Sequence, residues 1–246
     1  MTLAIIGGTG LTQIENIVIQ SRETLETPYG APSAAYQIAD WQGQKVIFLA
    51  RHGAPHRIPP HKVNYRANVW GLKQLGASRI IGVAAVGGVS QDAAPARIVI
   101  PDQIIDYTYG REHTYFADDL EHVTHIDFTE PYHPETRAQI ITAAAAIGLD
   151  AKIGGVYACT QGPRLETAAE IKRLIQDGAT VVGMTGMPEA ALTRELELPY
   201  ANLSVVANWG AGLTPGEITM AEIERNLQTG MQNAIRLLEQ IVLGAS

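Results

Sequence analysis

The sequence contains only one cysteine, Cys159, so an internal disulfide is excluded. A lone thiol is typical of a reducing compartment, where disulfides rarely persist. Val156 and Ala158 lie beside Cys159 and are apolar, which favours a buried, inert thiol over a nucleophile. We therefore expect Cys159 to belong to the core.

Long hydrophobic runs are also missing. The apolar run at 80–86 is far shorter than the roughly 20 residues that a membrane-spanning helix needs. The first residues, MTLAIIGGTG, lack the basic start and the small-residue cleavage site of a signal peptide. These absences predict a cytoplasmic protein with no membrane partner.

Positive charge is scarce as well, since the 246 residues carry a formal net charge of −7. Surfaces that follow a phosphate backbone are usually basic, so the charge argues against a general nucleic-acid partner and leaves room for a small anion. No Pro- or Ser-rich linker divides the chain. We therefore predict a single domain over residues 1–246.

What the sequence does contain is an alternation of apolar strand-like runs with helix-like segments, which is typical of an α/β fold. The expected strands lie at 3–6, 34–38, 45–50, 80–86, 98–105, 155–159 and 201–207, and the expected helices at 63–75, 134–147, 168–175 and 218–243. A capping box of Thr167 and Glu170 marks one helix start. The polar loop 106–134 is long enough to predict a lid or a subunit contact.

The stretch from Gly183 to Gly212 organises the rest. It predicts a turn, a helix whose N-terminus faces outward with Glu189 in its first turn, and a strand that ends at Asn208. Open α/β sheets bind ligands beyond the carboxyl ends of their strands, so Met184, Thr185 and Asn208 are candidates for one pocket.

A cationic loop follows the strand at 45–50 and carries Arg51, His52, His56, Arg57, His61 and Lys62. A solvated charge run is the ordinary interpretation, but the position directly after an apolar strand favours anion binding. The histidine spacing lacks a helix or a Cys/carboxylate pattern that would complete a zinc ligand set, so no metal is predicted.

Two further loops could contact a ligand. Glycines at 7, 8 and 10 allow backbone N–H groups to approach an anion, although a plain tight turn fits equally well. Gln13 stands where a dinucleotide-binding loop needs its third glycine, which disfavours an NAD-dependent oxidoreductase. Glu166, just before its helix cap, is either a solvated loop residue or a group that points into a site.

Together these motifs resemble the purine nucleoside phosphorylase and methylthioadenosine phosphorylase family over nearly the whole chain. The matching segments are GGTGL at Gly7, RHG at Arg51, KVNYRANVW at Lys62, QGPRLET at Gln161 and GMTGMPEAALTRELELPYA at Gly183. The resemblance implies a three-layer α/β/α fold with a mixed central sheet, usually a homotrimer. It also implies cleavage of a nucleoside by inorganic phosphate, a co-substrate, with no cofactor and no metal.

The resemblance further implies roles for individual residues. The implied phosphate ligands are Thr9, Arg51, His52, Thr185 and the backbone N–H of Ala85, where this chain lacks a threonine hydroxyl of the methylthioadenosine enzymes at Ala84. Met184 is implied to contact the ribose, His56 to support the site, and His125 to reach the 5′ pocket of a neighbouring subunit. The implied catalytic residues are Asn208, Glu166 and His56.

Purine specificity is predicted from two departures within the family. Adenine phosphorylases have aspartates where this chain has Asn208 and Gly210, and a serine where it has Glu166. An amide can donate to O6 of a 6-oxopurine, and a carboxylate accepts from N1–H, whereas adenine offers a bare N1 lone pair. The pair therefore predicts hypoxanthine or guanine.

At the 5′ end, relatives that act on ordinary nucleosides present a histidine near the start of the last helix. This chain has Thr219, Met220, Ala221 and Ile223 there, and that apolar wall suits a methylthio group. The expected substrate is 5′-methylthioinosine. Phosphorolysis of inosine or guanosine, phosphorolysis of methylthioadenosine, and a nucleoside-binding sensor without turnover remain as alternatives.

Overall fold

The computed structural model describes residues 2–8, 11, 14, 17–118 and 120–244. Its centre is an eleven-stranded mixed sheet that runs β2-β3-β4-β1-β5-β10-β9-β7, with β11 on β5, β6 on β11 and β8 on β6. The strands are β1 Leu3–Gly7, β2 Ile17–Glu23, β3 Tyr36–Trp41, β4 Gln44–Ala50, β5 Arg79–Gly88, β6 Ile98–Ile100, β7 Gln103–Asp106, β8 Lys152–Ile153, β9 Val156–Cys159, β10 Ala179–Gly183 and β11 Tyr200–Trp209.

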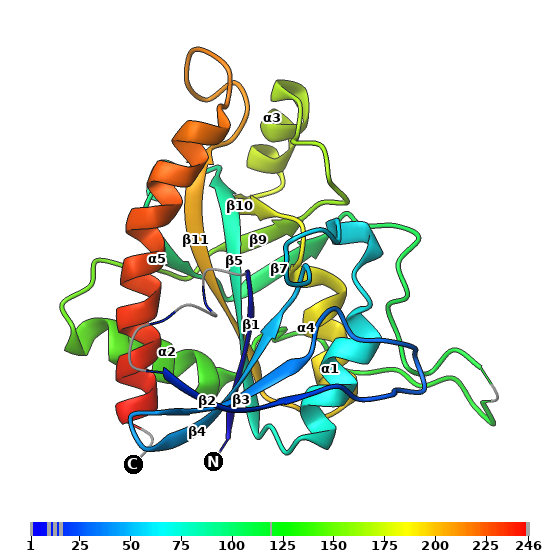
Figure 1. Ribbon diagram of the computed structural model, residues 1–246. Helices are drawn as coiled ribbons and strands as arrows, with labels where there is room; N and C mark the ends of the chain where they lie inside the picture. Colours follow the sequence, from blue (N-terminus) through cyan, green and yellow to red (C-terminus); the bar gives the residue numbers. More distant parts are fainter. Residues whose placement is uncertain (1, 9–10, 12–13, 15–16, 119, 245–246) are drawn as a thin grey trace.

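Helices cover both faces of this sheet (Figure 1). Their bounds are α1 Tyr65–Gln74, α2 Pro134–Ala146, α3 Ala168–Gln176, α4 Gly186–Glu195 and α5 Met220–Leu243, with a short 3-10 turn at Pro60–Lys62. Apolar side chains of α1 and α4 share one core with one face of the sheet, whereas those of α2, α5 and α3 pack on the other face. The three-layer α/β/α arrangement predicted from the resemblance is confirmed.

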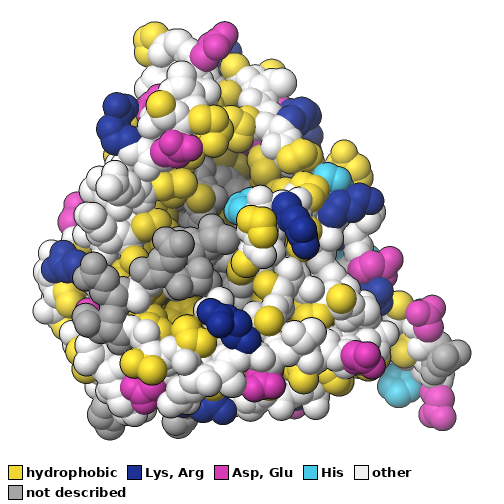
Figure 2. Space-filling view, in the orientation of Figure 1, with side chains coloured by type: hydrophobic (Ala, Val, Ile, Leu, Met, Phe, Trp, Pro, Cys, Tyr) yellow, Lys and Arg dark blue, Asp and Glu magenta, His cyan; other side chains and the backbone are white. Residues whose placement is uncertain are grey.

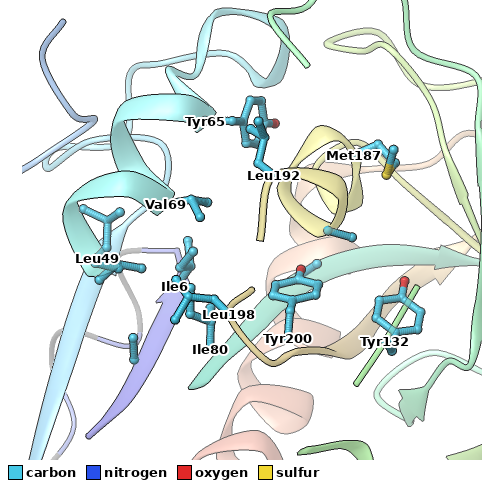
Figure 3. Packing of buried hydrophobic residues seen from close by; sticks show 14 of the residues in the cluster. Ile6, Leu49, Tyr65, Val69, Ile80, Tyr132, Met187, Leu192, Leu198 and Tyr200 are labelled. Atoms are coloured by element: carbon cyan, nitrogen blue, oxygen red, sulfur yellow. The ribbon is translucent and has the colours of Figure 1, made fainter. Parts of the chain in front are cut away.

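The core between α1, α4 and the sheet is built mainly from aliphatic and tyrosine side chains. Figure 3 shows Val69 of α1 beside Ile6 of β1, with Leu192 of α4 nearby. Burial of apolar surface of this kind contributes about 25 cal/mol per Å², so this layer stabilises the packing of the helices on the sheet. This core therefore supports the candidate site described below.

Several local predictions are confirmed. Thr167 and Glu170 form the expected capping box at the start of α3, and Cys159 is fully buried. The sequence missed β2, because its residues alternate between half-buried and exposed positions at the edge of the sheet. No described helix is both long and apolar enough to traverse a bilayer.

One expectation was wrong: the N-terminus of α4 does not face outward. All residues from Gly186 to Ala190 are buried, and Glu189 is only 1% exposed. Met187 has non-helical dihedral angles inside the first turn, so the chain bends there and carries the next turn toward the sheet. Glu189 is buried because it forms an ion pair with Arg51, which is described below.

Candidate active site

The sheet divides at β5, and this division creates the site. On one edge of β5, the parallel partner β1 ends its pairing at Gly82, and the antiparallel partner β10 begins at Gly87. In the described chain, residues 83–86 thus have no strand partner on that edge; we call this stretch the fork. Figure 1 shows β1 and β10 along different halves of β5. Positions where strand order changes are common ligand sites in α/β sheets.

Arg51 fills the fork from the end of β4. Its Nη1 donates to the Val83 carbonyl at 2.8 Å, and its Nη2 donates to the Ile6 carbonyl at 3.3 Å. Glu189 receives Nε at 2.7 Å and Nη2 at 2.8 Å, in a bidentate pair. Burial by itself lowers the pKa of Arg51, but the adjacent carboxylate raises it above its usual value. These contacts use four of the five guanidinium N–H groups and leave one on Nη1 without an acceptor among the described residues.

The carboxylate of Glu189 is enclosed as tightly as Arg51. Tyr200 donates its hydroxyl to Glu189 Oε1 at 2.9 Å. Gly82 provides the space, since a Cβ at that position would lie 2.3 Å from the Tyr200 hydroxyl and 2.7 Å from Glu189 Oε1. Of the cationic loop, therefore, Arg51 is a neutralised buried group, whereas His56, Arg57 and Lys62 are exposed.

His52 is half-buried next to Arg51 and has a fixed tautomer. Its Nδ1 lies 2.8 Å from the Ile58 carbonyl, so Nδ1 carries the hydrogen and Nε2 carries the lone pair. Burial, followed by the charge of Arg51, lowers the pKa of His52 to about 4. The ring of His56 stacks on it with centroids 4.5 Å apart. At neutral pH His52 is uncharged, and its Nε2 can accept a hydrogen bond.

This environment gives a pH-dependent stability. The folded pKa of His52, about 4, lies below the ordinary value of 6.5, so the unfolded chain binds more protons between these values. The contribution is present above pH 6.5 and is lost as the pH falls through 4. Replacing His52 by Gln should flatten the loss of unfolding free energy between pH 6.5 and 4, measured by urea titration. Equal slopes for both proteins would contradict the assignment.

Thr185 and Met184 lie where β10 turns into α4. Thr185 is 7% exposed, and its backbone N–H donates to the Tyr157 hydroxyl at 3.4 Å. The Met184 side chain packs against Gly162, where a Cβ would come within 2.4 Å of the thioether sulfur. The turn that follows β10 therefore touches the loop that follows β9.

A β-bulge directs Asn208. Val206 pairs with Val86 and Asn208 with Gly87, so Ala207 is an extra residue in β11. Asn226 of α5 donates to the Ala207 carbonyl at 2.8 Å and satisfies the group that leaves the ladder. Bulges commonly re-aim side chains next to active sites.

The bulge turns Asn208 to a particular face of the sheet. Residues 85 and 87 of β5 share a face because side chains alternate along a strand. Ala85 is the exposed position in an otherwise buried β5, so this face is open there. A Cβ on Gly87 would lie 3.7 Å from Asn208 Nδ2. Asn208 donates one N–H to the Trp209 carbonyl at 2.7 Å, which leaves one amide N–H and Oδ1 for a ligand.

Glu166 is held by Thr160 in the loop after β9. The Thr160 hydroxyl donates to Glu166 Oε1 at 2.7 Å and also lies 3.3 Å from the Gly183 carbonyl. Glu166 lines a pocket of about 260 Å³ together with Gln161 and Leu174. Its Oε2 remains available as an acceptor. Figure 2 shows the molecular face hollowed, with histidine at the edge of the hollow.

Of four further predicted site residues, the structure describes three. Thr9 falls outside the described residues. Gly210 is buried beside Ile171. His125 and Ala221 are exposed. Gly8 has open space where a Cβ would stand, as a loop that approaches an anion requires.

No group of three or more potential metal ligands occurs among the residues that the structure describes. Burial raises the pKa of the Cys159 thiol to about 12, so it is protonated at neutral pH. A buried, protonated thiol of this kind is a poor nucleophile.

The sequence analysis did not identify four residues that hold the predicted site residues in place through hydrogen bonds: Glu189, Tyr200, Thr160 and Arg111. Glu189 lies within a matching motif, but nothing local indicates that its partner is Arg51, 138 residues away. Thr160 directly precedes the QGPRLET segment, so of the four it was the residue whose position in the sequence best indicated a role in the site.

Comparisons with known proteins place this geometry in a family. A model described as the phosphorylase superfamily matches residues 2–243. The chain belongs to this superfamily. Its relatives in the superfamily include a probable S-methyl-5'-thioinosine phosphorylase from Pseudomonas syringae pv. tomato, 56% identical over 97% of each chain. A 6-oxopurine nucleoside phosphorylase from Pyrococcus furiosus is 44% identical over 96% of this chain and 90% of its own.

Solved structures of the superfamily agree with the fold. Methylthioadenosine phosphorylase from Schistosoma mansoni, in complex with adenine, has a TM-score of 0.93 at 28% identity, over 100% of this chain and 93% of its own. A methylthioadenosine phosphorylase from an antarctic soil metagenomic library has a TM-score of 0.91 at 37% identity, over 98% and 85%. The resemblance of the sequence motifs to nucleoside phosphorylases is thus confirmed.

Proposed function

We propose that this phosphorylase cleaves S-methyl-5'-thioinosine with inorganic phosphate to give hypoxanthine and 5-methylthioribose 1-phosphate. The observation that carries the proposal is the bulged β11, which turns Asn208 toward the open face at Ala85. The similarity to the Pseudomonas syringae protein, at 56% identity, supports the same substrate.

The purine is recognised by complementary donors and acceptors. The free N–H of Asn208 donates to O6, and Oδ1 accepts from a protonated N7. The free Oε2 of Glu166 accepts from N1–H, while Thr160 holds Oε1. Adenine would place its N1 lone pair against the carboxylate, and buried polar groups left unpaired reject a wrong substrate by about 10⁴ or more.

Phosphate binds at the fork. Ala85 and Val83 direct backbone groups to the same edge because successive peptide groups of a strand alternate, so the Ala85 N–H points into the fork. Thr185, Thr9 and the remaining N–H of Arg51 complete the proposed ligand set, and His52 Nε2 accepts a hydrogen bond from the hydroxyl of hydrogen phosphate. Phosphate is therefore held as a positioned dianion or monoanion beneath the sugar.

The reaction needs no nucleophile from the protein, since phosphate attacks C1′ as the glycosidic bond breaks. The protein positions phosphate and sugar, the latter against Met184, and stabilises charge that develops on the purine. Asn208 and Glu166 meet that charge at the base, and His56 supports His52 through their stacked rings. Of the residues in catalytic roles, Asn208 and Glu166 touch the leaving group.

The 5′ end favours a methylthio group, because Ala221 and its neighbour Met220, 67% exposed, offer apolar surface at the start of α5. The runner-up is phosphorolysis of inosine or guanosine, which the 44% identity to the Pyrococcus furiosus 6-oxopurine enzyme favours.

We extend the proposal to the assembly. A homotrimer would employ the exposed residues 117–118 and 120–125, among which Val123 is 69% exposed, to bring His125 to the 5′ pocket of a neighbour. The lone buried Cys159 supports a cytoplasmic location. We further propose one domain over residues 1–246 and activity without a metal or cofactor.

The first test measures hypoxanthine release from methylthioinosine in phosphate buffer and in phosphate-free buffer. We expect release only with phosphate, and rates on methylthioinosine above those on methylthioadenosine, inosine and guanosine. Release that is independent of phosphate would refute a phosphorylase. Phosphate binding without any product after long incubation would instead identify a sensor.

A further inference from the structure

Arg111 lies in the loop that follows β7, yet its side chain is buried, with 8% exposed. Its Nε donates to Gln161 Oε1 at 3.2 Å, and its Nη2 donates to the Gln161 carbonyl at 2.9 Å and the Thr160 carbonyl at 3.3 Å. One half of the guanidinium thus holds the loop that leads from β9 to Glu166.

The other half of Arg111 holds the turn between β10 and α4. Nη1 lies within hydrogen-bonding distance of the Met184 carbonyl, 2.9 Å, the Met187 carbonyl, 2.6 Å, and the Tyr65 hydroxyl, 3.3 Å. The guanidinium carbon also lies 5.6 Å from the centre of the Tyr65 ring. A single planar group therefore joins two turns and helix α1.

These carbonyls need a donor because the sheet stops beside them. β9 and β10 pair in parallel as far as Cys159 and Gly183, and the strand pairing ends there. Met187 has φ −118° and ψ 141°, outside the helical region. Unpaired buried carbonyls cost free energy, and the five donors of a guanidinium satisfy those of both turns at once.

We infer that Arg111 is a positioning residue that sets the turn carrying Glu166 relative to the turn carrying Met184 and Thr185, and that purine selectivity depends on it. The link to selectivity is Thr160, whose carbonyl binds Arg111 and whose hydroxyl binds Glu166. The inference rests on the proposed function, in which Glu166 reads the purine.

The chemistry of Arg111 is suited to position rather than to charge pairing. Its acceptors are carbonyl, amide and phenol oxygens, and none is a carboxylate. Lysine has three donors on a single nitrogen and cannot bridge two turns with a planar fork. The adjacent Glu112 is different, since it is exposed and forms an ordinary ion pair with Arg66.

The test compares Arg111→Lys with the wild type on methylthioinosine and methylthioadenosine at saturating phosphate. A displacement of about 1 Å in a site can cost about 10²-fold in rate, so we expect kcat/KM for the preferred nucleoside to fall by about that factor. Because the two substrates differ in their demand on Glu166, the ratio of their kcat/KM values should shrink about tenfold or more. Glu112→Gln, on the same loop, should change neither value.

The ratio separates positioning from mere stability. A loss of folded protein, which thermal melting would detect, lowers kcat/KM for both substrates by the same factor. An unchanged ratio therefore overturns the inference. If Arg111→Lys does not fold, Gln161→Met removes the Oε1 that accepts from Arg111 Nε and from the Tyr109 N–H, and the ratio must still shrink. If the wild type releases no base with phosphate, the proposed function fails separately. The ratio of hypoxanthine to adenine binding constants in wild type and Arg111→Lys then decides, and an unchanged ratio overturns the inference.

Discussion

The double variant Glu166→Ser with Asn208→Asp is expected to change the ratio of kcat/KM for methylthioadenosine over methylthioinosine by about 10⁴-fold in favour of adenine. The new carboxylate at 208 accepts from the 6-amino group and from a protonated N7, and the new hydroxyl at 166 donates to N1. The estimate follows from the penalty for an unpaired buried polar group. Steady-state rates on both nucleosides with phosphate measure it.

A single variant serves as the control. Asn208→Asp alone leaves Glu166 facing the N1 lone pair, so it should lower activity on methylthioinosine without conferring much activity on methylthioadenosine. This substitution also loses the 2.7 Å bond to the Trp209 carbonyl, which should cost about 1–3 kcal/mol of stability. A folded double variant that keeps the wild-type ratio would show that these two residues do not read the purine.

Replacing Glu189 by Gln should lower the free energy of unfolding by about 3–5 kcal/mol, because it leaves Arg51 as an uncompensated charge in the core. Arg51 and Glu189 are 2% and 1% exposed, so water cannot replace the lost carboxylate. Urea unfolding at pH 7, with and without phosphate, measures the loss. We expect the apparent KM for phosphate to rise as well, since Arg51 loses its fixed orientation at the fork.

Two variants calibrate this result. Tyr200→Phe removes one hydrogen bond to Glu189 and should cost about 1.5–3 kcal/mol. Glu112→Gln makes the same chemical change in an exposed ion pair with Arg66 and should cost about 1 kcal/mol or less. If the variants at Glu189 and Glu112 proved equally stable, the buried pair would not hold the fork.

Features coded by neighbouring residues could be predicted from the sequence. The capping box of Thr167 and Glu170 is complete within four positions, and the apolar strands at 3–6 and 80–86 emerge in β1 and β5. The expectation that Met184, Thr185 and Asn208 follow strands whose carboxyl ends share one edge of the sheet was wrong, because β10 runs antiparallel to β5 and β11 runs parallel to it.

Features that depend on distant partners could not be predicted. Arg111 has Glu112 and His113 as sequence neighbours and resembles a solvated loop residue, yet its acceptors come from three other segments. Glu189 appeared to lie in the first turn of an exposed helix because its partner Arg51, just after β4, is 138 residues away. Such side chains are placed by the completed fold, since only there do their donors and acceptors meet.

The extra residue in β11 makes ligand recognition a matter of residue count as well as residue identity. If Ala207 paired with Gly87 in a regular ladder, Asn208 would point into the apolar layer beneath α1 and α4, and the same side chains would no longer read the purine. The bond from Asn226 to the Ala207 carbonyl maintains the irregular pairing. In the proposed function, recognition of the purine therefore depends on the bulge and on Asn226 as well as on the residue at position 208.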